Sequence, residues 1–183
     1  GVIQEEGREE KVKYLPRHQS VGEISLPKLL IIALLAFFSF TIVASGIHEI
    51  GITIMTALLG GSVIHTTISW FWGATNITGS LAPWQMFLVM SSGTLFVTLF
   101  IFILLFYPEP LYTNITATVL GFRNLIDGAP FLSGSDGFQA AKISLIGAWI
   151  WYAVLFLVFA FAIAYSSGYR VTLDSEKKRG KRI

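Results

Sequence analysis

Residues 29–59 read LLIIALLAFFSFTIVASGIHEIGITIMTALL, and this stretch decides the fold class. Its first nineteen residues carry no charge. As an α-helix they would be about 28 Å long, close to the roughly 30 Å of bilayer hydrocarbon. The apolar character continues past His48 and Glu49, so the whole stretch is too long for one straight span unless it tilts, bends or enters the protein interior. We therefore predict an all-α integral membrane protein whose first spanning helix begins at Leu29.

The composition supports a membrane protein and excludes several other classes. Of the 183 residues, 54% are hydrophobic and 13% are charged, whereas an average soluble domain has roughly 25% charged residues. The thirteen Lys and Arg and the eleven Asp and Glu lie mostly near the two ends, so the chain offers no basic face for nucleic acid. The absence of cysteine excludes disulfides, thiolate nucleophiles and cysteine-ligated metal centres.

Four further segments complete the membrane domain. Residues 62–83 contain a β-branched run that predicts a small β-hairpin or re-entrant element. Residues 84–107 predict a second span, which two prolines end. Residues 111–122 are apolar but few, and polar and helix-breaking residues follow them, so they predict an interrupted helix inside the protein. Residues 143–165 predict the last span, which gives three to four transmembrane helices.

The distribution of charge divides the chain into three parts. We predict an exposed charged arm over residues 1–28, a helical membrane domain over 29–166 and a basic tail over 167–183. Basic residues at both ends favour two cytoplasmic termini and an even number of crossings through the lipid bilayer. Arg123 lies between them, and we expect it to be an interfacial residue. Because the chain begins with Gly1 rather than Met, we expect an upstream segment to have been removed or left out.

Ionisable residues inside the apolar region are the candidates for function, because a charge there costs at least about 2.5 kcal/mol. They are His48, Glu49, His65, Arg123, Asp127 and Asp136. His48 and Glu49 open the pattern HExxH, in which two histidines on one helix face bind zinc and the glutamate is the general base. Ile52 stands where the second histidine would be.

The neighbourhood of this pattern resembles a known family. Residues 46–53 (GIHEIGIT) and 57–61 (ALLGG) resemble the HExxH helix of site-2-type intramembrane metalloproteases, the M50 peptidase family. Residues 92–99 (SGTLFVTL) are similar to the start of the family's AGPLANLL helix. Residues 124–130 (NLIDGAP) and 135–141 (SDGFQAA) are similar to the NxxPxxPLDG segment that brings the third zinc ligand. The pieces occur in the family's order and cover most of the membrane part.

The resemblance implies a zinc site, and Ile52 at the position of the second histidine removes one of its ligands. By resemblance, His48 and Asp136 would bind zinc and Glu49 would be the catalytic base. Ile52 removes one imidazole and offers no donor atom in its place, and two ligands rarely hold catalytic zinc. His65 is a speculative replacement that would have to fold back from its loop. We therefore expect no cofactor and a vestigial or weak metal pair, with bound zinc as the alternative.

Three functions are consistent with these residues. The first is a catalytically inactive M50-like membrane protein that serves as a structural, assembly or regulatory subunit beside other membrane subunits. The second is an active intramembrane zinc protease with a substituted ligand set, in which Glu49 deprotonates a zinc-bound water. The third is a small membrane subunit of a respiratory or other redox complex, with haem on His48, with or without His65, or with buried carboxylates that relay protons. We favour the first, in which the protein is not an enzyme.

Overall fold

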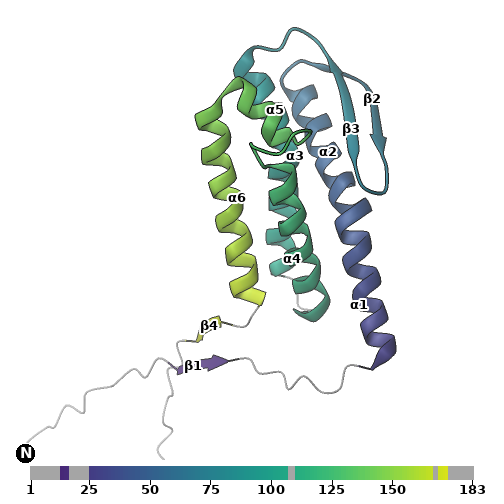
Figure 1. Cartoon of the computed structure of the whole chain (residues 1–183), viewed down its shortest axis with the longest axis vertical. Coiled ribbons are helices and arrows are strands. Elements are labelled where there is room, and N and C mark those ends of the chain that lie inside the picture. Colours follow the sequence, from purple (N-terminus) through teal and green to yellow (C-terminus); the bar gives the residue numbers. More distant parts are fainter. Residues whose placement is uncertain (1–12, 17–24, 107–109, 167–168, 173–183) are drawn as a thin grey trace, which may run out of the picture.

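The computed structural model describes residues 13–16, 25–106, 110–166 and 169–172. It is a bundle of helices with one β-hairpin packed along it (Figure 1). Among the described residues, three helices are long and apolar enough to cross a membrane, namely Leu26–Leu58, Pro83–Leu105 and Leu145–Tyr165. The predicted helical fold with helices of spanning length and a small hairpin is thus confirmed, and it is compatible with an all-α membrane protein.

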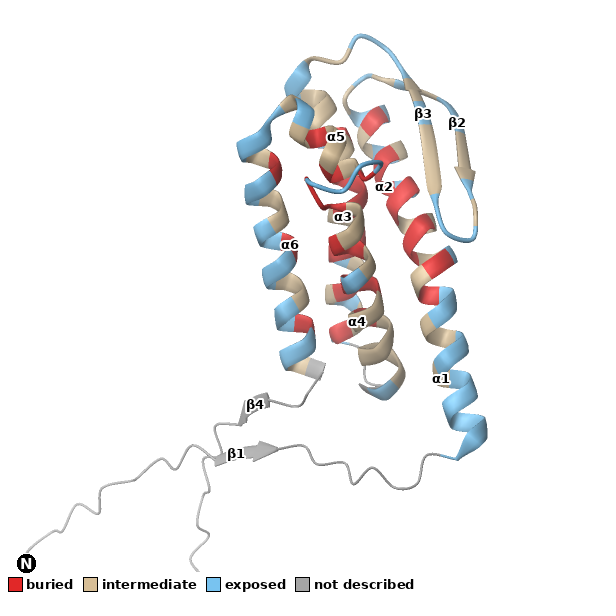
Figure 2. Cartoon of the chain, in the orientation of Figure 1, coloured by how far each residue is buried: buried red, intermediate tan, exposed pale blue. Residues whose placement is uncertain are grey.

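The first helix is a rod of 33 residues in three parts. α1 (Leu26–Phe38) passes directly into the π-helical segment η1 (Ser39–Val43) and then into α2 (Ala44–Leu58). None of the thirteen residues of α1 is buried, whereas much of one face of α2 is buried (Figure 2). The stretch that is too long for a straight span therefore enters the protein interior, and the π-helical segment lies where its two halves meet.

The predicted hairpin consists of β2 (Ser62–Ile68) and β3 (Gly73–Thr78), which pair antiparallel. It lies along α2, and its turn reaches down to the end of α1 (Figure 1). There the ring of Trp70 lies 6.1 Å from that of Phe37 and 6.2 Å from that of Phe38, centroid to centroid. These aromatic contacts place the turn beside the middle of the first helix.

After the hairpin the chain runs down, up and down again along the bundle (Figure 1). α3 (Pro83–Leu105) returns to the lower end of the bundle in Figure 1, and α4 (Pro110–Asp127) rises beside it. The predicted interruption follows α4, after which come α5 (Asp136–Ile143), which continues upward, and α6 (Leu145–Ser166), which runs down again. Ser135 caps α5, because its hydroxyl accepts a hydrogen bond from the Phe138 amide at 3.0 Å. The Asp136 carboxylate is therefore left for another contact.

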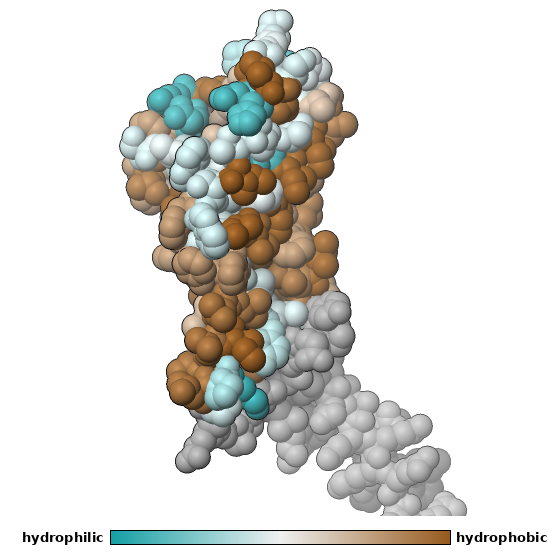
Figure 3. Space-filling view, turned by 90° about the vertical axis from the view of Figure 1, so that its right-hand side faces the viewer, coloured by the Kyte–Doolittle hydropathy of each residue, from teal (hydrophilic) through white to brown (hydrophobic). Residues whose placement is uncertain are grey.

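A narrow apolar core holds the lower half of the bundle together. Its buried members come from α2, α3, α4 and α6: Ala44, Val97, Ile101, Leu105, Ala117, Leu120 and Ala162. The outside is also apolar, and large side chains such as Leu30, Ile103 and Leu157 are more than half exposed. Figure 3 shows this apolar surface along much of one side, with hydrophilic residues gathered toward the upper end. Such a surface is suited to contact with lipid.

Both ends of the helical domain lie at the lower end of the bundle (Figure 1). Two short strands, β1 (Lys13–Pro16) and β4 (Tyr169–Thr172), pair antiparallel there. The sequence does not predict this pairing, since charge composition carries no information on backbone hydrogen bonds. The other residues of the predicted arm and tail, 1–12, 17–24, 167–168 and 173–183, lie outside the described residues.

Candidate functional site

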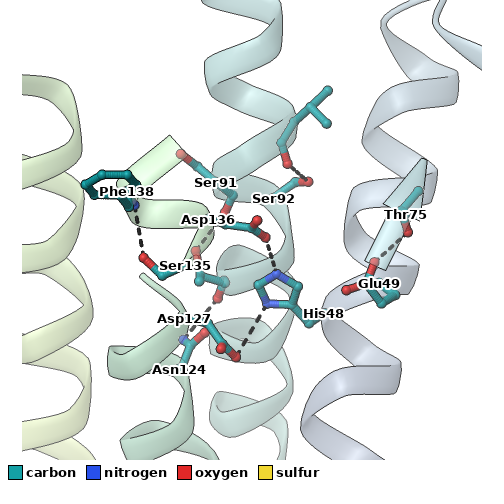
Figure 4. A network of polar contacts seen from close by, with 12 residues as sticks. His48, Glu49, Thr75, Ser91, Ser92, Asn124, Asp127, Ser135, Asp136 and Phe138 are labelled. Carbon is teal, nitrogen blue, oxygen red and sulfur yellow. Dashed lines mark hydrogen bonds and ion pairs between the residues drawn. The ribbon is translucent and has the colours of Figure 1, made fainter. Parts of the chain in front are cut away.

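The predicted site residues of the first helix lie in the upper half of the bundle, on α2. His48 and Glu49 are 5% and 3% exposed. Because consecutive helical residues point about 100° apart, the two side chains have different neighbours. His48 points toward α4 and α5, and Glu49 points toward the hairpin (Figure 4).

His48 lies between two aspartates. Its Nε2 is 2.5 Å from Oδ2 of Asp136 at the start of α5, and its Nδ1 is 4.0 Å from Oδ2 of Asp127 at the end of α4. An ionised carboxylate only accepts hydrogen bonds, so Nε2 is the donor to Asp136. Nδ1 is buried and makes no hydrogen bond with a described residue. The imidazole thus joins α2 to α5 and faces α4 across a wider gap.

Arg123 belongs to the same network, a set of contacts that the prediction of an interfacial or snorkelling residue does not include. Its Nε donates to Oδ2 of Asp127 at 3.0 Å, and its guanidinium carbon lies 5.3 Å from the ring centroid of Phe40. The side chain is 14% exposed. We call Arg123, Asp127, His48 and Asp136 the His48 network. The network thus consists of two carboxyl groups, one guanidinium and one imidazole.

A glycine on α3 makes room for the imidazole. A methyl group added at Gly93 would overlap the His48 ring. Gly93 follows Ser91 and Ser92, and such small residues in a membrane helix allow a neighbouring helix to approach closely. The serine–glycine cluster in the sequence is the signal for this contact, although it does not say which residue fills the space.

Glu49 holds the hairpin against α2. Thr75 Oγ1 on β3 donates a hydrogen bond to Glu49 Oε2 at 2.5 Å. The hydroxyl of Thr66 lies 3.2 Å from that of Thr75 and 3.4 Å from that of Thr53, which extends the polar contact back to α2. Gly73 lies so close that a methyl group there would overlap the Glu49 carboxylate. No motif in the sequence indicates the pairing with Thr75, because it depends on the register of the hairpin.

The residues present do not fit a three-ligand zinc site. His65 is on the exposed face of β2, where its Nε2 lies 2.8 Å from Thr67 Oγ1, and it is not brought to His48. Ile52, one turn after His48, is 6% exposed and apolar. In the part of the chain that the structure describes, no three His, Asp or Glu side chains are arranged to hold a metal ion.

The site is therefore an ion-pair network in the bundle interior, built from residues on three helices. Its members from the motifs, His48 and Asp136, meet although 88 residues separate them. Glu49 points to a different side of α2 and accepts a hydrogen bond from the hairpin. The function has to be argued from this geometry, since the chain matches no protein-family model, no curated protein and no solved structure.

Proposed function

We propose that the protein is a catalytically inactive relative of the site-2-type intramembrane metalloproteases and acts as a structural, assembly or regulatory subunit of a membrane complex. The observation that supports this is the direct bond between His48 and Asp136, the two residues that the resemblance assigns to zinc. Zinc bonds of about 2.0 Å at tetrahedral angles hold two ligand atoms about 3.3 Å apart. The His48 and Asp136 atoms are 2.5 Å apart and bond to each other.

The partners of Glu49 and Ile52 support the same proposal. A general base has to reach the water that it deprotonates, but the Glu49 carboxylate is bonded to Thr75 on the hairpin. At the position of the second histidine, Ile52 places a buried apolar side chain that cannot bind a metal ion. In our proposal these residues connect α2 to its neighbours, and the bundle is a scaffold to which other membrane subunits attach.

An active zinc protease is the second candidate. The meeting of His48 and Asp136 from distant parts of the chain favours it, because two zinc ligands would have to meet in the same way. This candidate requires a third protein ligand, which the described residues do not supply. It also requires Glu49 to exchange its bond to Thr75 for a water molecule.

Metal analysis of the purified protein tests the proposal, with Ile52→His as the informative variant. We expect the wild type to contain far less than one zinc per chain. Ile52→His restores the second imidazole one helical turn from His48 and is expected to gain a zinc site with His48 and Asp136. The matched control is Ile54→His on the exposed face of α2, which is expected to gain none.

Two results would count against this proposal. One zinc per wild-type chain, together with cleavage of a transmembrane peptide, would support the protease instead. Failure of Ile52→His to gain zinc over Ile54→His would mean that residues 46–53 are not aligned with the HExxH helix. In that case the resemblance itself would have to be abandoned.

We further infer four crossings, with α4 and α5 together as an interrupted fourth. The return of the chain to its lower end supports this, as do the basic segments at both termini, which favour the cytoplasmic side. Because the chain has no cysteine, single substitutions can report the side of the membrane. Ser20→Cys and Ser175→Cys are expected to react with an impermeant maleimide from one side of oriented vesicles, and Ser80→Cys, in the exposed connection between β3 and α3 at the upper end of the bundle, from the other. Labelling of Ser20→Cys and Ser175→Cys from opposite sides would contradict four crossings.

A further inference from the structure

The π-helical segment η1 lies between the exposed and the buried halves of the first helix. Its residues Ser39 and Thr41 are buried, and Thr41 Oγ1 donates to the carbonyl oxygen of Phe37 at 2.8 Å. A π-turn accommodates one more residue than an α-turn, and such turns occur frequently at functional sites. What this extra residue does can be read from the contacts on either side of it.

The first helix contacts α4 at two levels. At the lower level, Phe40 of η1 lies under the Arg123 guanidinium and stacks on Phe122, with ring centroids 6.4 Å apart. At the upper level, His48 faces Asp127. On α4, Arg123 and Asp127 are one turn apart and bonded to each other. The first helix therefore contacts both members of the Arg123–Asp127 ion pair of α4.

The π-turn brings these two contacts onto one face. Phe40 and His48 are eight residues apart, and at about 100° per residue a regular α-helix would place them about 80° apart around its axis. A π-turn absorbs one residue, which reduces the offset to about 20°. Without the π-turn, Phe40 could not lie under Arg123 while His48 faces Asp127. No residue of α1 is buried, whereas seven residues of α2 are, so α1 is the half that can turn at the lower cost, and its ring contacts with Trp70 turn with it or break.

We propose that η1 is a two-state coupler between α1 and the His48 network. In the π-helical state, Phe40 stacks on Arg123, Arg123 holds Asp127, and His48 bonds to Asp136. When η1 changes to a regular α-helix, α1 turns by about one residue and Phe40 leaves Arg123. The contacts of Asp127 and His48 then loosen, and α5 is released from α2. A force on α1 or on the arm before it is thereby transmitted to the interior, whether or not the bundle belongs to a larger complex.

Amide hydrogen exchange of the full chain in lipid nanodiscs tests this coupling. Phe40→Leu is expected to raise exchange in α5 by at least about fivefold, the lower end of measured couplings between sites. Ile42→Leu changes an exposed residue of the same segment and is expected to leave exchange in α5 unchanged. Because coupling is reciprocal, His48→Gln is expected to raise exchange in residues 39–43 by a similar factor. Residues 157–164 of α6 are the reference for any global loss of stability.

Either of two results would overturn the proposal. One is equal effects of Phe40→Leu and Ile42→Leu on α5, which would show that the stack on Arg123 transmits nothing. The other is unchanged exchange in residues 39–43 of His48→Gln while exchange rises in α5. If circular dichroism shows that Phe40→Leu does not fold, the His48→Gln measurement decides alone, since spatial proximity without measured coupling is not sufficient.

Discussion

His48→Ala is expected to lower the free energy of unfolding by about 3 kcal/mol, the low end of the range for a buried ion pair that loses one partner. The substitution leaves Asp136 without its hydrogen-bond donor and Asp127 without a facing imidazole. The low end applies because the side chains of these aspartates are 25% and 18% exposed, so solvent reduces the cost. Denaturant-induced unfolding in detergent micelles measures the change.

His65→Ala is the matched control for this result. His65 is exposed, and its Nε2 contacts Thr67 within the same strand, so its loss is expected to change stability by less than about 0.5 kcal/mol. A double-mutant cycle of His48→Ala with Asp136→Asn should give a coupling energy of at least about 1 kcal/mol, because the two residues are in direct contact. Additive effects would mean that the bond between them contributes nothing to stability.

Gly93→Ala is expected to destabilise the protein by about 1–3 kcal/mol, the usual cost of overpacking an interior. The added methyl group overlaps the His48 ring, so either the ring leaves Asp136 or α3 moves away from α2. Gly46 lies on α2 close to His48. A methyl group added there by Gly46→Ala would meet no atom of a neighbouring element within 4 Å. Because alanine favours helix over glycine by about 1 kcal/mol, this control is expected to be neutral or stabilising.

The difference between the two alanine variants isolates the contact with the imidazole. Both substitutions add one methyl group to a membrane helix, and only one of them meets the His48 ring. The free energies of unfolding measured in the same micelles should therefore differ by at least about 1 kcal/mol, with Gly93→Ala below the wild type and Gly46→Ala at or above it. Equal stability of the two variants would show that α2 and α3 tolerate a wider separation than the structure has.

The local features of the fold could be predicted from the sequence. Uncharged runs of spanning length, the β-branched run before Trp70, and the polar residues after Phe122 are each visible within twenty or so residues. The π-helical segment could not be predicted, because the apolar run on both sides of Thr41 is continuous and shows no change in pattern. Its presence depends on contacts with α4, which come from another part of the chain.

The site could be predicted in part. The resemblance names His48 and Asp136, and the structure places them in contact. For Arg123 the sequence-based prediction of an interfacial or snorkelling residue did not include its partners. The structure shows that they are Asp127 at i+4 and Phe40. The i, i+4 spacing was available in the sequence as a signal.

The bond between His48 and Asp136 also has a consequence for biosynthesis. The ribosome makes His48 88 residues before it makes Asp136. The first helix must therefore enter the bilayer with its imidazole unpaired, and the nascent chain remains incompletely stabilised until α5 emerges. Truncated translation products that stop before α5 should accordingly be good substrates for membrane quality control.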